Sequence, residues 1–72
     1  SEGFNKVLEA AKLGTPEAQM IVHTLYFNGL GTKRDMRQSL LWLTRAAEQD
    51  HADAQFKYIN YTKIITTWIQ QN

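Results

Sequence analysis

The chain repeats itself at a long interval, and this repeat constrains its fold more than any other feature. The residues that match after a shift of 36 positions are small or apolar: Ala10-Ala11 with Ala46-Ala47, Ala18-Gln19 with Ala54-Gln55, Phe4 with Leu40, and Val7 with Leu43. A period of this size is typical of helix pairs that stack on one another, because one pair cannot bury its apolar face alone. The repeat therefore predicts an all-α fold of the solenoid kind.

The spacing of apolar residues predicts two helices in the first half of the chain. The first covers residues 1–13, with Ser1 as its cap and Gly14 as the left-handed residue after its end. The second covers residues 16–28, because Thr15-Pro16 suits the start of a helix. Their apolar stripes comprise Phe4, Val7, Leu8 and Ala11 in the first helix, and Ala18, Ile21, Val22, Leu25 and Tyr26 in the second.

Two further helices are expected in the second half. A loop with two glycines ends before Asp35, which fits a capping box with Gln38 and so starts the third helix. Residues 52–72 contain neither Gly nor Pro, and their apolar spacing predicts one long final helix. The stretch 59–69 is rich in Ile and Thr, so a strand is the competing interpretation, although a lone strand has no partner in this chain.

Small, aromatic and glycine residues follow one another at fixed distances through the middle of the chain: Ala18-Gln19, Val22, Tyr26, Gly29-x-Gly31, Asp35, Trp42, Ala46-Ala47 and Ala54. This order closely resembles the Sel-one-like repeat, a relative of the tetratricopeptide repeat. The resemblance implies a short α-solenoid over residues 1–72, a right-handed superhelical stack of antiparallel helix pairs. Residues 1–14 then end a preceding repeat, residues 15–50 form one full repeat, and residues 51–72 form a degenerate C-terminal capping helix.

Several positions depart from the pattern of that family. His23 and Ile59 stand where the family has a Gly that lets two helices approach closely. Ser39 replaces the usual Ala, and Asp50 replaces the closing Gly. In the last copy, Ile and Thr occupy the two loop-glycine positions, so the helical reversal is expected to fail there and the array to end.

Composition and charge exclude several classes of function. Eight Lys and Arg face seven Asp and Glu, so the net charge of +1 gives no electrostatic case for nucleic acid or an anionic membrane. The absence of cysteine excludes disulfides, thiolate metal sites and a cysteine nucleophile. The longest apolar run, Leu40–Leu43, is far shorter than the ~20 residues that span a bilayer, so no membrane insertion is expected. No signal peptide is visible, and because the chain starts at Ser1 we expect a processed or excised piece of unknown compartment, cytoplasmic, periplasmic or secreted.

No motif in the chain predicts catalysis, a cofactor or a metal. Residues 29–33 lack the glycine spacing of a phosphate loop. The cluster at residues 50–53 suits helix capping better than metal ligation. Ser39 stands in a core position, and the sequence suggests no oriented histidine and acid beside it. We therefore expect no enzymatic activity.

The resemblance implies a non-catalytic adaptor that binds a protein or peptide through the concave face of the helical repeat. We predict that this face is lined by outward positions of the second and last helices. These positions are Gln19, His23, Phe27, Phe56, Asn60 and Lys63. The amides and the histidine would pair with the backbone of the partner, and the two phenylalanines would anchor its apolar side chains.

Two other functions stay open. The final segment carries more apolar surface than a lone helix can hide, at Ile64, Ile65, Trp68 and Ile69, so it packs back as a cap or against a twin chain in a homodimer. A basic helical nucleic-acid binder is the third class, suggested by the cluster of Lys33, Arg34 and Arg37. The balanced charge elsewhere counts against it.

Overall fold

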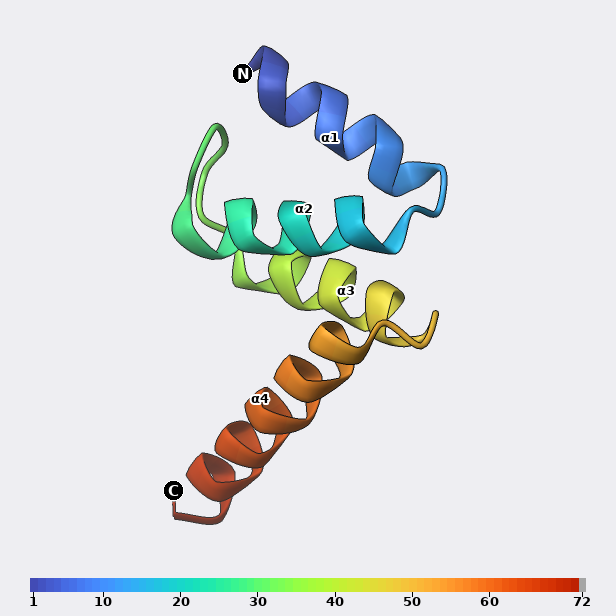
Figure 1. The fold of residues 1–72 in the computed structure, drawn as a ribbon. Coiled ribbons are helices and arrows are strands. Elements are labelled where there is room, and N and C mark those ends of the chain that lie inside the picture. The colour runs from blue at the N-terminus through green and yellow to red at the C-terminus, as the bar shows by residue number, and fades with distance from the viewer. Residues whose placement is uncertain (72) are drawn as a thin grey trace.

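A computed structural model describes residues 1–71 and shows four α-helices with no strand among them (Figure 1). They are α1 (Glu2–Lys12), α2 (Pro16–Asn28), α3 (Met36–Ala47) and α4 (Ala52–Gln71). The predicted all-α fold and its four helices are confirmed. The competing strand over residues 59–69 is wrong, because the Ile and Thr residues there lie within α4.

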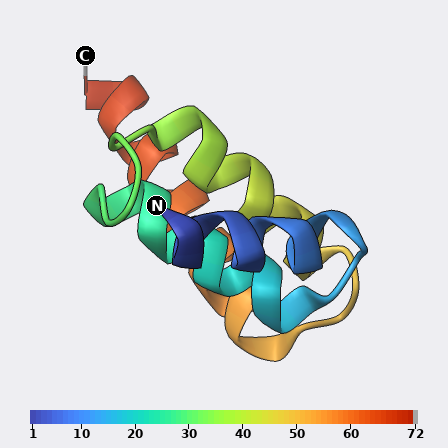
Figure 2. The ribbon, with the colours of Figure 1, turned by 90° about the horizontal axis from the view of Figure 1, so that it is seen from above.

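The helices stack in chain order, with α1 against α2, α2 against α3 and α3 against α4. The result is a thin body of 41 × 27 × 13 Å. Seen from above in Figure 2, α1 lies over α2 and the later helices continue behind it. In Figure 1, α4 diverges from α3, so that its C-terminal half extends past the other three helices. The right-handed superhelical sense of a solenoid stays a prediction.

Local signals fix several helix ends as the sequence predicted, although Thr15 at the start of α2 makes no side-chain capping hydrogen bond. The Ser1 hydroxyl accepts a hydrogen bond from the Phe4 amide at 3.2 Å, and Gly29 ends α2 in the left-handed conformation with φ of 69°. Asp35 caps α3 by accepting from the Gln38 amide at 3.1 Å. Its own amide donates to the Tyr26 carbonyl at 3.0 Å, so a contact with α2 takes the place of the second bond of a capping box.

The internal repeat is visible in the hydrogen bonds. The Gln19 side-chain amide donates to the Ala11 carbonyl at 3.1 Å, and Gln55 donates to the Ala47 carbonyl at the same distance. Both bonds tie the first helix of a pair to the second. The residues that open the turns before α2 and α4 also match, because both Gly14 and Asp50 have positive φ. The pair α1–α2 is therefore repeated locally by α3–α4.

The core is small and rich in alanine, which lets the helices approach closely. One buried cluster joins α1, α2 and α3 through Ala11, Ala18, Val22 and Trp42. A second joins α3 to α4 through Leu43, Ala46 and Ala54. Ile21, which the apolar spacing placed on the core stripe of α2, is instead largely exposed, because the neighbouring helices cover the adjacent faces.

Candidate partner-binding surface

Two of the six predicted contact residues lie in the interior. Gln19 is 3% exposed and His23 is 2% exposed. The Gln19 amide donates to Ala11, and its oxygen accepts from the Gln49 side chain at 2.9 Å. The prediction that Gln19 and His23 face a partner is therefore wrong for this structure, because their polar atoms are already bonded within the chain.

His23 is bonded to Ser39 of α3. The Ser39 hydroxyl lies 2.7 Å from His23 Nδ1 and 3.0 Å from the His23 carbonyl, and Nδ1 lies 3.0 Å from the Ser39 carbonyl. The hydroxyl donates its one proton to the His23 carbonyl, so Nδ1 carries a hydrogen and donates to Ser39; this tautomer is assigned from the network. Burial lowers the pKa of His23 below 6.5, with a smaller lowering from Lys57, while the bond to the Ser39 carbonyl opposes the change.

This pair was not predicted, although the sequence carries a signal for it. His23 stands where the pattern of the Sel-one-like repeat has Gly, Ser39 stands where that pattern has Ala, and the two departures meet across one helix interface. The distance is one that a serine nucleophile and its base would also adopt. Ser39 has no exposed surface and its hydroxyl is bonded to a carbonyl, so a substrate cannot reach it while α2 and α3 are packed.

Phe27 belongs to an aromatic cluster at the edge of the core. Its ring stacks on Tyr61 of α4 with centroids 6.1 Å apart and an angle of 10°. The His23 ring lies 6.0 Å from Phe27 and 5.9 Å from Tyr61. The Arg34 guanidinium lies 5.9 Å above the Phe27 ring. Phe27 thus joins α2 to α4, and it is half-buried rather than fully available to a partner.

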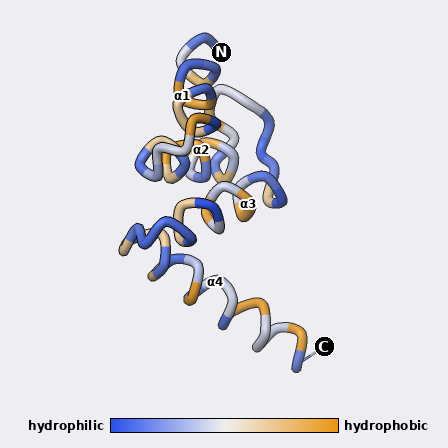
Figure 3. The backbone as a smooth tube through the Cα atoms, turned by 90° about the vertical axis from the view of Figure 1, so that its right-hand side faces the viewer, coloured by the Kyte–Doolittle hydropathy of each residue, from blue (hydrophilic) through white to orange (hydrophobic). Residues whose placement is uncertain are grey.

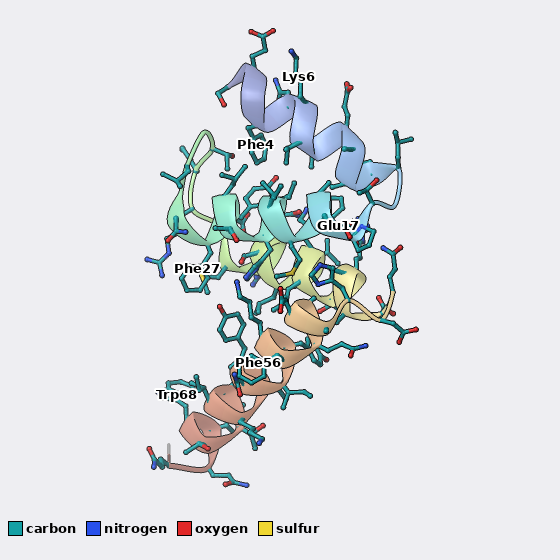
Figure 4. All side chains as sticks on the ribbon, viewed as in Figure 1. Phe4, Lys6, Glu17, Phe27, Phe56 and Trp68 are labelled. Atoms are coloured by element: carbon teal, nitrogen blue, oxygen red, sulfur yellow. The ribbon has the colours of Figure 1, made fainter. Side chains whose placement is uncertain are left out.

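Phe27 and Tyr61 also form walls of an apolar groove of about 260 Å³ between the end of α2, the start of α3 and α4. The other lining residues are Met36, Leu40, Ile64 and Ile65. In Figure 4, Phe27 and Trp68 both lie on the left-hand side of the view. The groove is one place where the structure offers an apolar anchor site.

The other three predicted contact residues lie on α4. Phe56 and Lys63 are exposed and Asn60 is half-buried. They are three and four residues apart, so they share one face of the helix. The structure therefore groups these three residues and separates them from Gln19 and His23.

Large apolar side chains are exposed along the whole of α4. Figure 3 shows hydrophobic positions recurring along this helix to its end. The members with at least two fifths of their surface exposed are Phe56, Tyr58, Ile59, Ile64, Ile65, Trp68 and Ile69. One stripe runs from buried Ala54 through half-buried Tyr61 to exposed Ile65, so its exposure increases toward the C-terminal end of α4.

The remaining candidate sites have structural roles. His51 Nδ1 accepts from the Ala54 amide at 3.2 Å and so caps α4. Asp50 accepts from the Gln55 side chain at 3.4 Å. Across residues 1–71, no group of three or more His, Cys, Asp or Glu is placed to hold a metal ion. None of the described helices combines the length and the apolar character needed to cross a membrane.

No family model, curated protein or solved structure matches this chain. The resemblance to the Sel-one-like repeat therefore rests on the residue pattern itself. The paired hydrogen bonds of Gln19 and Gln55 support the internal repeat independently of any relative.

Proposed function

We propose that the chain is a non-catalytic module that binds a protein or peptide through α4. The observation that carries the proposal is the set of seven large apolar side chains that this helix exposes. Large apolar side chains exposed together on one element of a folded protein mark interaction sites, because their exposure to water is unfavourable. The resemblance to the Sel-one-like repeat supports the same class of function.

The chemistry of the patch favours a protein partner. Phe, Tyr and Trp residues are common energetic anchors of protein interfaces, and α4 exposes Phe56, Tyr58 and Trp68. Lys57 and Lys63 are the only charged residues that α4 carries beyond its first turn. A long helix with exposed apolar side chains on several faces and few charges suits packing against another helix or an extended apolar segment.

The experiment compares apolar positions on α4 with one elsewhere. Proteins retained by the immobilised wild-type chain are identified, and one of them is purified and titrated against Phe56→Glu, Ile64→Glu and Leu13→Glu variants. Leu13 is a matched control because it is 88% exposed and lies beyond the end of α1. We expect at least a tenfold loss of affinity for the α4 variants and none for the control, with circular dichroism unchanged throughout. Equal binding by all variants would refute the assignment of α4.

Phe27 is unsuitable for this test, although the sequence paired it with Phe56. Its ring stacks on Tyr61 and lies beside His23, so Phe27→Ala removes contacts between α2 and α4. A loss of binding in that variant would confuse folding with recognition. Phe56 has no such complication because 68% of its surface is exposed.

Self-association is the second candidate, and the divergence of α4 from α3 favours it (Figure 1). Two copies would cover their exposed stripes by packing the C-terminal halves of α4 together around a twofold axis. Light scattering after size exclusion, over a concentration series, tests this directly. A dimer that Ile64→Glu converts to a monomer supports it, whereas a monomer at every concentration removes it.

A further inference from the structure

The internal repeat provides a comparison within the molecule. α2 lies between α1 and α3, whereas α4, its counterpart, packs on α3 and has no described helix on its other side. On α2, Val22 is fully buried and His23 is nearly so, because α3 covers both. Their counterparts on α4, Tyr58 and Ile59, are 42% and 52% exposed. The exposed face of α4 therefore corresponds to the face of α2 that another helix covers.

A groove of about 410 Å³ between α3 and α4 marks the vacant position. Its lining residues are Thr44, Ala47, Glu48, Gln55, Tyr58 and Ile59. A shift of 36 positions converts these into Leu8, Ala11, Lys12, Gln19, Val22 and His23. Trp42 of α3 packs in one buried cluster with Ala11 of α1 and Val22 of α2, and Leu8 packs against that cluster. The groove that is open between α3 and α4 thus corresponds to the one that Trp42 fills between α1 and α2.

We propose that the groove between α3 and α4 receives a helix of a different protein, placed against α4 as α3 is placed against α2, with an aromatic side chain seated as Trp42 is. This inference rests on the proposed function, that α4 binds a protein, and it names the chemistry of the partner. Continuity with the interface between α2 and α3 is the physical basis, because the same stack of helices continues by one more member.

The lining of the groove specifies the partner further. Ile59 replaces His23, so the partner has a small apolar residue in the place of Ser39, three positions before the aromatic residue. In α3, Arg45 lies three positions after Trp42 and its guanidinium is 4.5 Å above the indole ring. Glu48 lines the open groove where Lys12 stands in the filled one, so this edge of the groove carries a negative charge and favours an Arg or Lys on the partner.

The α3 segment of this chain supplies a probe for the test. A labelled peptide of residues 34–50 carrying S39A is titrated into the wild-type chain, and binding is measured by fluorescence anisotropy. The expected result is saturable binding that falls at least tenfold when the peptide also carries W42A. In the protein, Ile59→Glu lowers affinity at least tenfold, whereas Ile69→Glu, similarly exposed on α4 but outside the groove, does not.

A charge reversal tests the orientation of the peptide. The peptide with R45E binds the wild-type chain several-fold more weakly, because Glu48 then faces a like charge. The Glu48→Lys variant restores that loss. Failure of the restoration, with the other results intact, would overturn the α3-like orientation. Circular dichroism of each protein variant keeps folding and binding apart.

Other results would overturn the proposal outright. These are no saturable binding at millimolar peptide, equal loss with Ile59→Glu and Ile69→Glu, or binding that Ile59→Glu leaves intact. A dimer of the wild-type chain that Ile59→Glu dissociates would make a second copy the occupant, and would also overturn it. The partner titration with Phe56 and Ile64 variants is a separate measurement, so failure of the peptide leaves the proposed function of α4 standing.

Discussion

The buried contact between His23 and Ser39 makes a quantitative prediction about stability. Ser39→Ala removes the hydroxyl bond to the His23 carbonyl and the contact with Nδ1, but leaves the Ser39 carbonyl to accept from Nδ1. No buried donor is orphaned, so we expect a cost of about 1 kcal/mol, the net value of a typical hydrogen bond. His23→Ala also empties space beside Phe27 and Tyr61, and large-to-small changes in cores cost about 2–5 kcal/mol.

A double-mutant cycle separates the contact from the space. Urea unfolding followed by circular dichroism gives the free energy of unfolding for wild type, both single variants and the double variant. Because the two side chains touch, we expect a coupling of about 0.5–1.5 kcal/mol, whereas distant pairs add within about 0.5 kcal/mol. For a domain of this size, 1 kcal/mol shifts the melting temperature by about 4–8 °C, so the effect is measurable. Strict additivity would refute a stabilising contact between the Ser39 hydroxyl and the His23 ring. The hydroxyl bond to the His23 backbone carbonyl survives in His23→Ala, so the cost of Ser39→Ala in that background measures it.

Three further predictions concern single residues. Because burial lowers the pKa of His23, the unfolded chain takes up a proton before the folded chain does as the pH falls below 6.5. The free energy of unfolding should therefore fall between pH 6.5 and the folded pKa, and this contribution should be constant above pH 6.5. A His23→Gln variant should lose this component in a pH series of urea melts, and an unchanged profile would contradict the prediction. Asp50 has a positive φ of 62°, as does its counterpart Gly14, so Asp50→Gly should raise the free energy of unfolding by about 0.5–1 kcal/mol. Asp53→Gly, within α4, should lower it, and a lower value for both variants would contradict the backbone argument. The buried Trp42 indole N–H has no hydrogen-bond partner among the described residues. Trp42→Phe should therefore change the free energy of unfolding by no more than about 1 kcal/mol, against about 3–5 kcal/mol for Trp42→Ala. Similar thermal shifts for the two variants would show that the unpaired N–H does not destabilise the protein.

The elements of this fold were predictable because their signals are local. Ser1 and Asp35 cap helices through bonds to amides three residues away, and Gly29 ends α2 by its own backbone conformation. The long α4 was also predictable, since weak helix formers still form a helix when no second strand exists to pair with them. The superhelical sense depends on angles between helices, which no local signal encodes.

The surface was harder to predict because burial on α2 depends on two neighbouring helices at once. The sequence separates an apolar stripe from polar positions, and Gln19 and His23 fall on the polar side. Both lie in the interior because Ala11 of α1, Ser39 of α3 and Gln49 in the turn after α3 supply hydrogen bonds to them. The repeated Ala-Gln dipeptide was the available signal, since an amide that recurs at the repeat period has a structural role in each copy.

The matching helices α2 and α4 differ in the residues that cover their outer faces. On α2, the buried His23 is bonded by Ser39 of α3, and such bonds demand one register because an unpaired group would be costly. On α4 the corresponding residue is Ile59, and Tyr58 beside it replaces Val22, so apolar contacts that tolerate a range of neighbours take the place of that bond. Gln55 donates to the Ala47 carbonyl as Gln19 donates to the Ala11 carbonyl, so the side of α4 that faces α3 is held by the same hydrogen bond that joins α2 to α1. The chain therefore fixes the inner side of its last helix by hydrogen bonds and leaves the outer side apolar, which is the combination that a helix needs to belong to one stack and to receive a neighbour from another chain.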